Sequence, residues 1–464
     1  MPPLSALSIV LHSHMPYVEG HGTWPFGEEW LWEAIATSYL PLLELLERGA
    51  PLTLSVTPVL ADQLEAPGAA ERCLTFLREV RPASHRLDVD AFEAEGREDL
   101  AAELVRAAGD YRVAAQRLLA CLGDLLGALA PYAAWTSSAT HAVLPLLATT
   151  PGIRLQLAAG IESHRARTAP LPWAGGFWLP ECAHADWLEP LLEEAGVRAT
   201  CVDFTDVLGH GDARHLRPLR TDAGPVLVPV DRATMDLVWS DAGYPSHAAY
   251  RDYHHRTARD HHPWANDGAV YRPARASAQA RADAADFVAR TRARLAGGGL
   301  AVCALDTELL GHWWYEGPQW LEAVVDEADR AGLALVPLDA ALAEIEPGPP
   351  LPATGRVTTW GSPRDLSTWS GPAVADLAVQ ARDAELRVVA AGRAAGPRAV
   401  RELLALQSSD WAFLAARGTA GDYPRRRAAA HRRALDEALA LPEAFEPTLR
   451  HLAPGLDPGP LLSP

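Results

Sequence analysis

The 464-residue sequence contains no lysine. Schiff-base chemistry needs a lysine amine, and the phosphate-binding P-loop needs a lysine that reaches the phosphates, so both are excluded. Cysteine is also scarce, and no two of the five residues have C-x-x-C spacing (Cys73, Cys121, Cys182, Cys201 and Cys303). This pattern indicates reduced thiols in a cytoplasmic protein rather than a disulfide framework.

Positive charge is in deficit, because 41 basic residues face 59 acidic ones and the formal charge is −18. Nucleic acids and anionic membrane surfaces both attract cationic proteins, so we expect neither as a partner. Long apolar runs are absent too, since none approaches the about 20 residues of a membrane-spanning helix. The first residues, 1–4, lack the basic region that opens a signal peptide. The oligomeric state has no signature in the sequence.

What is present is ordinary globular composition, with 48% hydrophobic and 22% charged residues over a length that suggests two or three domains. Tryptophan, with 15 residues, outnumbers phenylalanine, with 8. Flat indole rings serve core packing and sugar stacking equally well, so composition alone does not choose between these roles.

Short apolar runs alternate with longer helical patterns along most of the chain. The runs predict strands at 6–12, 52–57, 133–136, 175–179, 199–202, 225–230 and 300–305. The helical patterns between them cover 28–47, 186–195, 276–295 and 319–331. Such alternation predicts an α/β fold, either a parallel barrel or a doubly wound sheet.

Two stretches depart from this alternation. Residues 62–130 are rich in alanine, leucine and arginine with helical periodicity, which predicts a helical insertion. Beyond the proline cluster at 347–352, helices are predicted at 372–391, 399–416 and 423–439. We therefore expect a first domain over 1–345, a helical C-terminal domain over 346–455 and a frayed, proline-rich tail over 456–464.

Two carboxylates follow directly after buried strands. Glu181 comes after Phe-Trp-Leu-Pro, and Asp306 comes after Ala-Val-Cys-Ala-Leu. Barrel enzymes place catalytic groups at the carboxyl ends of strands, and a facing pair of carboxylates is what glycoside cleavage requires. The structural alternative is that each caps the next helix or pairs with an arginine. Glu308 is a further candidate.

Three histidines also stand near strand ends, His12 and His14 in an H-x-H pair and His141 after the third predicted strand. Side chains at i and i+2 share one face of a strand, which suits metal ligation. The same placement suits hydrogen bonding to sugar hydroxyls or a purely structural role. The residues alone leave these three interpretations open.

Most tryptophans of a globular protein lie in its core. Trp360 and Trp369 differ, because the loop 361–368 between them is rich in glycine, serine, proline and aspartate. Indoles in such a polar loop favour a carbohydrate cleft.

Taken together and in order, these motifs resemble glycoside hydrolase family 57. The resemblance spans about 7–433 and rests on His12-x-His14-x-Pro-Tyr, Trp24-Pro-Phe-Gly-Glu, Thr-His141, Pro-Glu181-Cys and Asp306-Thr-Glu-Leu-Leu-Gly-His-Trp-Trp314. Two further motifs, Val-Trp239-Ser and Gln-Ser-Ser-Asp410-Trp, look most like those of the α-1,4-glucan branching enzymes of that family.

The resemblance implies an incomplete (β/α)7 TIM-like barrel with the helical insertion at about 62–130, and a helical C-terminal domain that contributes to the substrate cleft. It implies a retaining mechanism without metal or cofactor, with Glu181 as nucleophile and Asp306 as general acid/base. The implied substrate contacts are His12, His14, Trp24, His141, Arg232, Trp239, Trp314, Trp360, Trp369 and Asp410.

The implied activity cleaves α-1,4 links and transfers the chain to a 6-hydroxyl, which forms α-1,6 branches in an amylose- or glycogen-like glucan. The sequence departs from the family at 207–231, where a longer loop usually carries a tyrosine that favours transfer; here the segment is short and has no tyrosine. An α-amylase-like hydrolase of the same family is therefore the first alternative. A non-catalytic glucan-binding protein and a metal-dependent hydrolase are the others.

Overall fold

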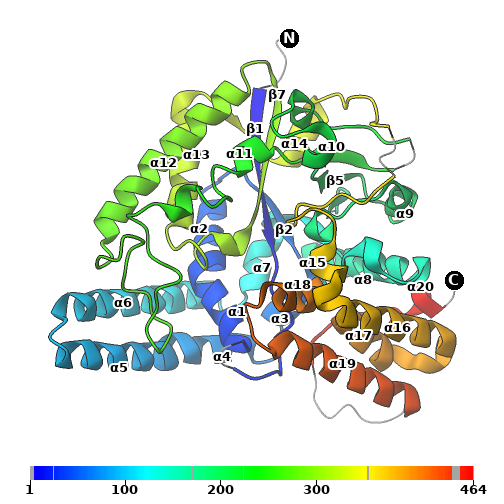
Figure 1. Ribbon diagram of the computed structural model, residues 1–464, viewed down its shortest axis with the longest axis horizontal. Coiled ribbons are helices and arrows are strands. Elements are labelled where there is room, and N and C mark those ends of the chain that lie inside the picture. Colours follow the sequence, from blue (N-terminus) through cyan, green and yellow to red (C-terminus); the bar gives the residue numbers. More distant parts are fainter. Residues whose placement is uncertain are drawn as a thin grey trace.

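Seven parallel strands form a barrel in the computed structural model, which describes residues 5–23, 26–169, 172–222, 224–352, 355–441 and 450–462 (Figure 1). The strands are β1 (Ser5–Ser13), β2 (Thr53–Val56), β3 (Ala133–Ser137), β4 (Gly176–Trp178), β5 (Ala199–Val202), β6 (Val226–Pro229) and β7 (Gly299–Asp306). They pair in the order β6-β5-β4-β3-β2-β1-β7, and the two-residue β8 (Ala334–Leu335) pairs with β1. Each was predicted within two residues of its observed ends, except β8.

The barrel is nearly closed between its end strands, β6 and β7. The backbone N–H of Asp231, just after β6, donates to the carbonyl of Val302 on β7 at 2.9 Å. Arg294, on the helix before β7, forms an ion pair with the fully buried Asp231 carboxylate at 3.0 Å. This backbone hydrogen bond and this buried charge pair both help to join the seam. This arrangement confirms the expected incomplete (β/α)7 barrel.

Helices surround the barrel and form the two predicted helical regions. Those preceding β4 are α1 (Glu28–Ala34), α2 (Leu40–Glu47), α3 (Pro58–Leu64), α4 (Ala69–Thr75), α5 (Arg81–Ala94), α6 (Glu98–Ala120), α7 (Leu125–Leu129) and α8 (Thr150–Thr168). Those between β4 and the C-terminal region are α9 (Glu189–Glu194), α10 (Thr205–Leu208), α11 (Arg232–Met235), α12 (Pro273–Arg294), α13 (Gly317–Ala331) and α14 (Leu338–Glu344). A π-helical turn, η1 (Ile35–Tyr39), joins α1 to α2, so the predicted helix at 28–47 is one continuous segment.

The helical insertion lies between β2 and β3, and its long helices α5 and α6 pack side by side and project from the barrel (Figure 1). The C-terminal region consists of α15 (Ser367–Ser370), α16 (Ala375–Ala391), α17 (Gly396–Leu406), α18 (Ser409–Arg417), α19 (Tyr423–Ala440) and α20 (Gly459–Leu462). Its hydrophobic core includes Ala139, Val143 and Leu155 from the barrel side. The C-terminal helices therefore share a core with the barrel.

Two expectations for the C-terminal region are corrected. The single helix predicted at 399–416 is two helices, because the backbone turns to an extended conformation at Ser408 between α17 and α18. The tail predicted to fray over 456–464 instead forms α20, which packs on α8 with Leu461 fully buried. Leucines at this end of the chain thus find an apolar surface despite the surrounding prolines. Residues 463–464 lie outside the described residues.

Within the described ranges, no single helix has the length and apolar character needed to cross a membrane. One pair, Glu98–Ala120 with Leu125–Tyr132, meets that criterion only jointly, with a 79° bend between its members.

Candidate active site

The two predicted catalytic carboxylates both lie at carboxyl ends of barrel strands. Asp306 is the last residue of β7 and pairs in register with His12 on β1. Glu181 follows β4 in a tight turn and has φ of 61°, a left-handed conformation that is costly for a residue other than glycine. The Thr359 hydroxyl and the Trp360 N–H both donate to the Glu181 carbonyl, at 2.7 and 3.1 Å, and hold this turn in place.

Among the described residues, two groups donate hydrogen bonds to the Glu181 carboxylate. Trp360 Nε1 donates to Oε2 at 3.0 Å, and Ser409 Oγ donates to Oε1 at 3.4 Å. Burial, together with the nearby negative charge of Asp306, raises the pKa of Glu181 to about 7, while the Trp360 bond opposes that rise. The donors therefore favour the ionised form of this carboxyl group.

Asp306 has a different environment. Burial, followed by the charge of Glu308, raises the pKa of Asp306 to about 7. Among the described residues no side chain donates to its carboxylate, and it neither caps the turn that follows it nor pairs with an arginine. Of the two carboxyls, Asp306 is thus the one that the surroundings favour in the protonated state.

Glu308, the third candidate carboxylate, joins two segments beside the site. Its Oε1 accepts from the backbone N–H of His14 at 3.0 Å and from the Tyr39 hydroxyl at 2.5 Å. Burial raises the pKa of Glu308 to about 7. These bonds tie the end of β1 to η1, so the side chain supports the wall of the site.

The three predicted histidines are brought together. His12 Nε2 and His141 Nε2 are 3.0 Å apart in a hydrogen bond, and the His12 ring stacks on Trp178 with centroids 4.6 Å apart. Burial, and then the neighbouring histidines, hold the pKa of both His12 and His141 well below the ordinary value. Both rings are therefore neutral near pH 7, where each nitrogen can serve as donor or acceptor according to the tautomer.

His14 differs from its two neighbours because it faces a carboxylate. Its Nε2 lies 3.0 Å from Asp410 Oδ1, at the start of α18. Burial alone would lower the pKa of His14, but the Asp410 charge and hydrogen bond, with smaller effects of Glu308 and Glu181, raise it above its ordinary value. Figure 1 shows α18 and α15 close to the lower ends of the strands, where this contact joins the C-terminal region to the barrel.

Arg232 and the predicted tryptophans take varied positions. Arg232 donates to Asp203 at 2.9 Å and to the Trp360 carbonyl at 2.7 Å, so it supports Trp360 from behind. Trp360 is half-buried and meets the edge of Trp178, with ring centroids 5.0 Å apart. Trp239 is 43% exposed.

Two other tryptophans are buried in cores. Trp314 is 1% exposed against Tyr250 and Trp320, and Trp369 is 3% exposed among the C-terminal helices. Both pack as core residues and offer almost no surface to a substrate in this structure. Trp24 lies outside the described residues.

A group suited to a metal ion lies elsewhere in the described part of the chain. His184, Asp186 and Glu189 have ligand atoms within 4.8 Å of one another. His184 Nε2 is already hydrogen-bonded to Glu189 at 3.1 Å. The histidines at 12, 14 and 141 are instead engaged with each other, with hydroxyls and with Asp410.

Sequence reasoning missed the hydroxyl groups that orient these side chains. Ser409 contacts both Glu181 and His141 Nδ1, the latter at 2.9 Å, and Ser55 contacts His12 Nδ1 at 3.1 Å. Ser409 stands next to Asp410 in the motif Gln-Ser-Ser-Asp410-Trp, and this motif is the sequence signal that could have pointed to it. Ser55 has no such signal.

The segment 207–231 includes β6 itself, and residues before that strand contact the helix that precedes β7. Arg294 donates to the carbonyls of Gly211 and Asp212, both at 2.8 Å. His215 is buried and bonds the Gly209 carbonyl, whereas His210 is exposed and contacts Asp236 at 3.0 Å.

Comparison with known proteins connects this site to a family. The model of glycosyl hydrolase family 57 matches residues 134–348, and that of the 1,4-alpha-glucan branching enzyme C-terminal domain matches 375–447. A probable 1,4-alpha-glucan branching enzyme of Mycobacterium tuberculosis is 34% identical, over 98% of this chain and 95% of its own length.

Solved structures agree with this match over the whole fold. The GH57-type branching enzyme of the archaeon Pyrococcus horikoshii superposes with a TM-score of 0.88 at 28% identity, covering 99% of this chain and 97% of its own. The GH57 branching enzyme of Thermococcus kodakaraensis, solved with glucose and additives, has a TM-score of 0.86 at 28% identity, covering 99% and 96%. The chain with this carboxylate pair therefore belongs to glycosyl hydrolase family 57.

Proposed function

We propose that the protein is a 1,4-alpha-glucan branching enzyme, which cleaves α-1,4 links and rejoins the released chain through a 6-hydroxyl as an α-1,6 branch. The unequal environments of the two carboxyls carry this proposal. Glu181 has two donors that favour its charged form, while Asp306 has none among the described side chains. The relatives that match this chain over nearly its full length are named as branching enzymes, which supports the choice of reaction.

The different environments of the two carboxyls suit a retaining mechanism in two steps. Asp306 donates its proton to the glycosidic oxygen as the bond from that oxygen to the anomeric carbon breaks. Glu181 attacks the same carbon and forms a covalent glycosyl-enzyme. A 6-hydroxyl of an acceptor chain then attacks that carbon, returns its proton to Asp306 and releases Glu181 as a carboxylate.

Other side chains in the site position the substrate. The neutral rings of His12 and His141 hydrogen-bond each other in this structure, so a sugar hydroxyl would bind them by replacing that bond. The pair of His14 and Asp410 adds a charged donor and acceptor. Trp360 both donates to Glu181 and offers part of its ring as a sugar-stacking surface. Arg232 acts through Trp360, and the exposed Trp239 offers an aromatic surface to the glucan chain.

Hydrolysis is the second candidate function, and the segment 207–231 favours it. It has no tyrosine, and Arg294 holds part of it against the barrel. If nothing else covers the glycosyl-enzyme, water competes with the 6-hydroxyl. A cytoplasmic location accompanies both candidates, since all five cysteines are free thiols.

Proton NMR of amylose incubated with the protein separates the two reactions. Branching gives new α-1,6 anomeric signals with few new reducing ends, whereas hydrolysis gives reducing ends without α-1,6 signals. Glu181→Gln is expected to abolish both products, and Glu194→Gln, on the exposed surface of the next helix, is the matched control that keeps them. Near-native activity of Glu181→Gln would refute the nucleophile assignment.

A further inference from the structure

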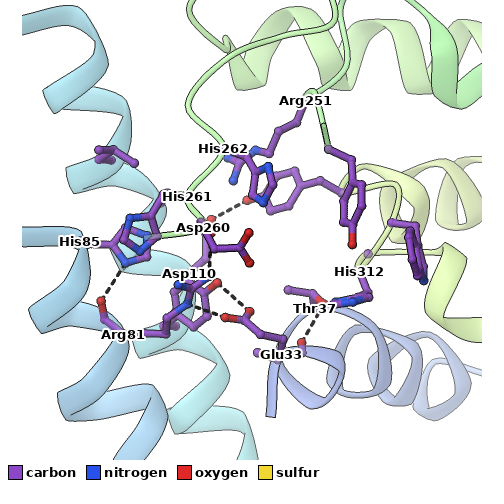
Figure 2. Close-up of a pocket in the computed structure, with 18 residues that line it drawn as sticks. Glu33, Thr37, Arg81, His85, Asp110, Arg251, Asp260, His261, His262 and His312 are labelled. Carbon is purple, nitrogen blue, oxygen red and sulfur yellow. Dashed lines mark hydrogen bonds and ion pairs between the residues drawn. The ribbon is translucent and has the colours of Figure 1, made fainter. Parts of the chain in front are cut away.

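A polar cavity of about 110 Å³ lies beside the insertion, and none of the proposed steps uses it. Its walls come from α5, α6, the segment α1–η1 and the loops at 251–262 and 311–315. Figure 2 shows the labelled side chains around a central space, with Arg81 and His85 from α5 on one side and His312 on the other. A water needs about 10–15 Å³ of such space, so the cavity has room for roughly ten water-sized groups, comparable to one hexose ring.

The charges around the cavity do not favour an anion. Three carboxylates and two arginines line it, and both arginines are already paired. Arg81 forms an ion pair with Glu33, and its two terminal nitrogens donate to backbone carbonyls. Arg251 donates to Glu103 at 2.9 Å and stacks over Tyr315. A ligand with negative charge would meet an excess of carboxylate, so a neutral ligand fits this lining better.

The histidines of the lining supply neutral hydrogen-bonding groups. Burial lowers the pKa of His85, His262 and His312 to about 4 in each case. A neutral imidazole has one donor and one acceptor nitrogen, which matches a sugar hydroxyl. Among the described residues, neither the His312 ring nor the Tyr253 hydroxyl has a hydrogen-bond partner. These groups are therefore available to a ligand.

Aromatic surface lies next to these polar groups. Trp313 is 43% exposed, and its ring centroid is 4.8 Å from that of Tyr253 at an angle of 38°. Trp313 also belongs to the loop that starts at Asp306, and seven residues of chain span at most about 25 Å. One short glucan chain could thus contact both this loop's end and the reacting carboxylates.

We propose that this cavity is a second carbohydrate site, which binds one neutral hexose unit of an α-glucan chain against Trp313 and Tyr253 with hydrogen bonds from His312. The identity of the sugar rests on the proposed function. The cavity anchors a chain near the active site without taking part in bond cleavage.

Calorimetric titration with maltotriose tests the proposal on the whole protein. The native chain should bind two equivalents. Two variants change the cavity: Trp313→Ala removes an aromatic surface, and Ala107→Phe fills the space. Each should raise the dissociation constant of one maltotriose site about tenfold or more and leave that of the other site unchanged. Trp187→Ala removes another exposed tryptophan, which does not line the cavity, and should keep both equivalents. Inorganic phosphate should not displace maltotriose from either site.

Native stoichiometry of one or zero, native-like binding by both cavity variants, or displacement of maltotriose by phosphate would each overturn this inference. Proton NMR of amylose incubated with the same proteins tests the proposed branching activity independently of the cavity site. Two maltotriose equivalents without α-1,6 products would refute branching and leave the cavity site standing. Branch formation with only one bound equivalent of maltotriose would support branching and refute the cavity site.

Discussion

At the scale of single residues, the site depends on which carboxyl keeps its proton. Burial raises the pKa of both Glu181 and Asp306 to about 7, so burial alone does not assign their roles. The hydrogen bond from Trp360 makes the difference, because a donor stabilises the charged form of the group it contacts. In the proposed mechanism, the neighbouring groups rather than the residue types therefore assign the roles of nucleophile and acid.

Trp360→Phe tests this assignment. The variant removes the donor to Glu181 but keeps an aromatic ring beside Trp178, so the pKa of Glu181 should rise. The acidic limb of the pH profile of kcat/KM, where the nucleophile becomes protonated, should move up by about one pH unit. The measurement is initial cleavage rate of amylose from pH 4 to pH 9. An unchanged acidic limb would show that Trp360 does not control Glu181.

Asp306→Asn should stabilise the fold while abolishing cleavage. The native carboxyl holds its proton up to about pH 7, whereas in the unfolded chain it releases it near 3.8. Stability contributed by the protonated form is therefore lost as pH rises toward 7. The amide does not titrate, so the free energy of unfolding of the variant should exceed that of the native protein by on the order of 2 kcal/mol at pH 8 and by less at pH 5. Thermal unfolding at both pH values measures the gain, and an equal or larger gain at pH 5 would contradict the raised pKa.

At the scale of elements, the strands could be predicted because each one is buried on both faces and reads as a short apolar run. The break between α17 and α18 could not be predicted, because the apolar periodicity continues through Ser408. Helix α20 was missed because prolines and glycines precede it, and its stability comes from the contact of Leu461 with distant helices.

In the candidate site too, local sequence patterns point to some residues, whereas residues that act through tertiary contacts leave no pattern. Glu181 and Asp306 could be proposed from the sequence because an ionisable residue directly after a buried strand is unusual. The hydroxyls of Ser55 and Ser409 act only through tertiary contacts, which leave no local pattern. Trp314 was expected at the substrate and lies in the core, because sequence spacing does not distinguish a packed indole from a stacking surface.

The seam between β6 and β7 gives a prediction at this scale. Arg294→Met would leave the fully buried Asp231 without its charge partner and free the carbonyls of Gly211 and Asp212. We expect the free energy of unfolding to fall by about 3–5 kcal/mol, since removing one partner leaves a buried charge uncompensated. Denaturant unfolding measures it.

Arg290→Met on the same helix is the matched control. Arg290 pairs with Asp286 at the exposed surface, where such a pair contributes little, so its loss should cost less than about 1 kcal/mol. Equal costs for the two variants would mean that the seam does not depend on the buried pair.

At the scale of the whole molecule, the candidate active site lies where the C-terminal helices meet the barrel. Ser409 and Asp410 reach Glu181, His141 and His14 from α18. Any contact that fixes the C-terminal helices on the barrel should therefore affect catalysis as well as stability.

Glu385 on α16 is such a contact. Its fully buried carboxylate accepts from the Ala148 N–H at 2.9 Å, the Thr149 hydroxyl at 2.5 Å and Gln407 Nε2 at 2.9 Å, so it joins α16 to the start of α8 and the end of α17. Glu385→Ala leaves these donors unsatisfied and should cost about 2–4 kcal/mol.

Because Gln407 directly precedes the serines of the site, Glu385→Ala should also lower kcat on amylose several-fold at a temperature where the variant remains folded. Asp376→Ala, on the exposed face of the same helix, is the control that should leave both stability and kcat near native values. Circular dichroism gives the melting temperatures, and reducing-end and α-1,6 assays give the rates. A destabilised Glu385→Ala with native kcat would show that the active site tolerates movement of the C-terminal helices, and that α18 is held in place by the barrel contacts of Asp410 and Ser409 alone.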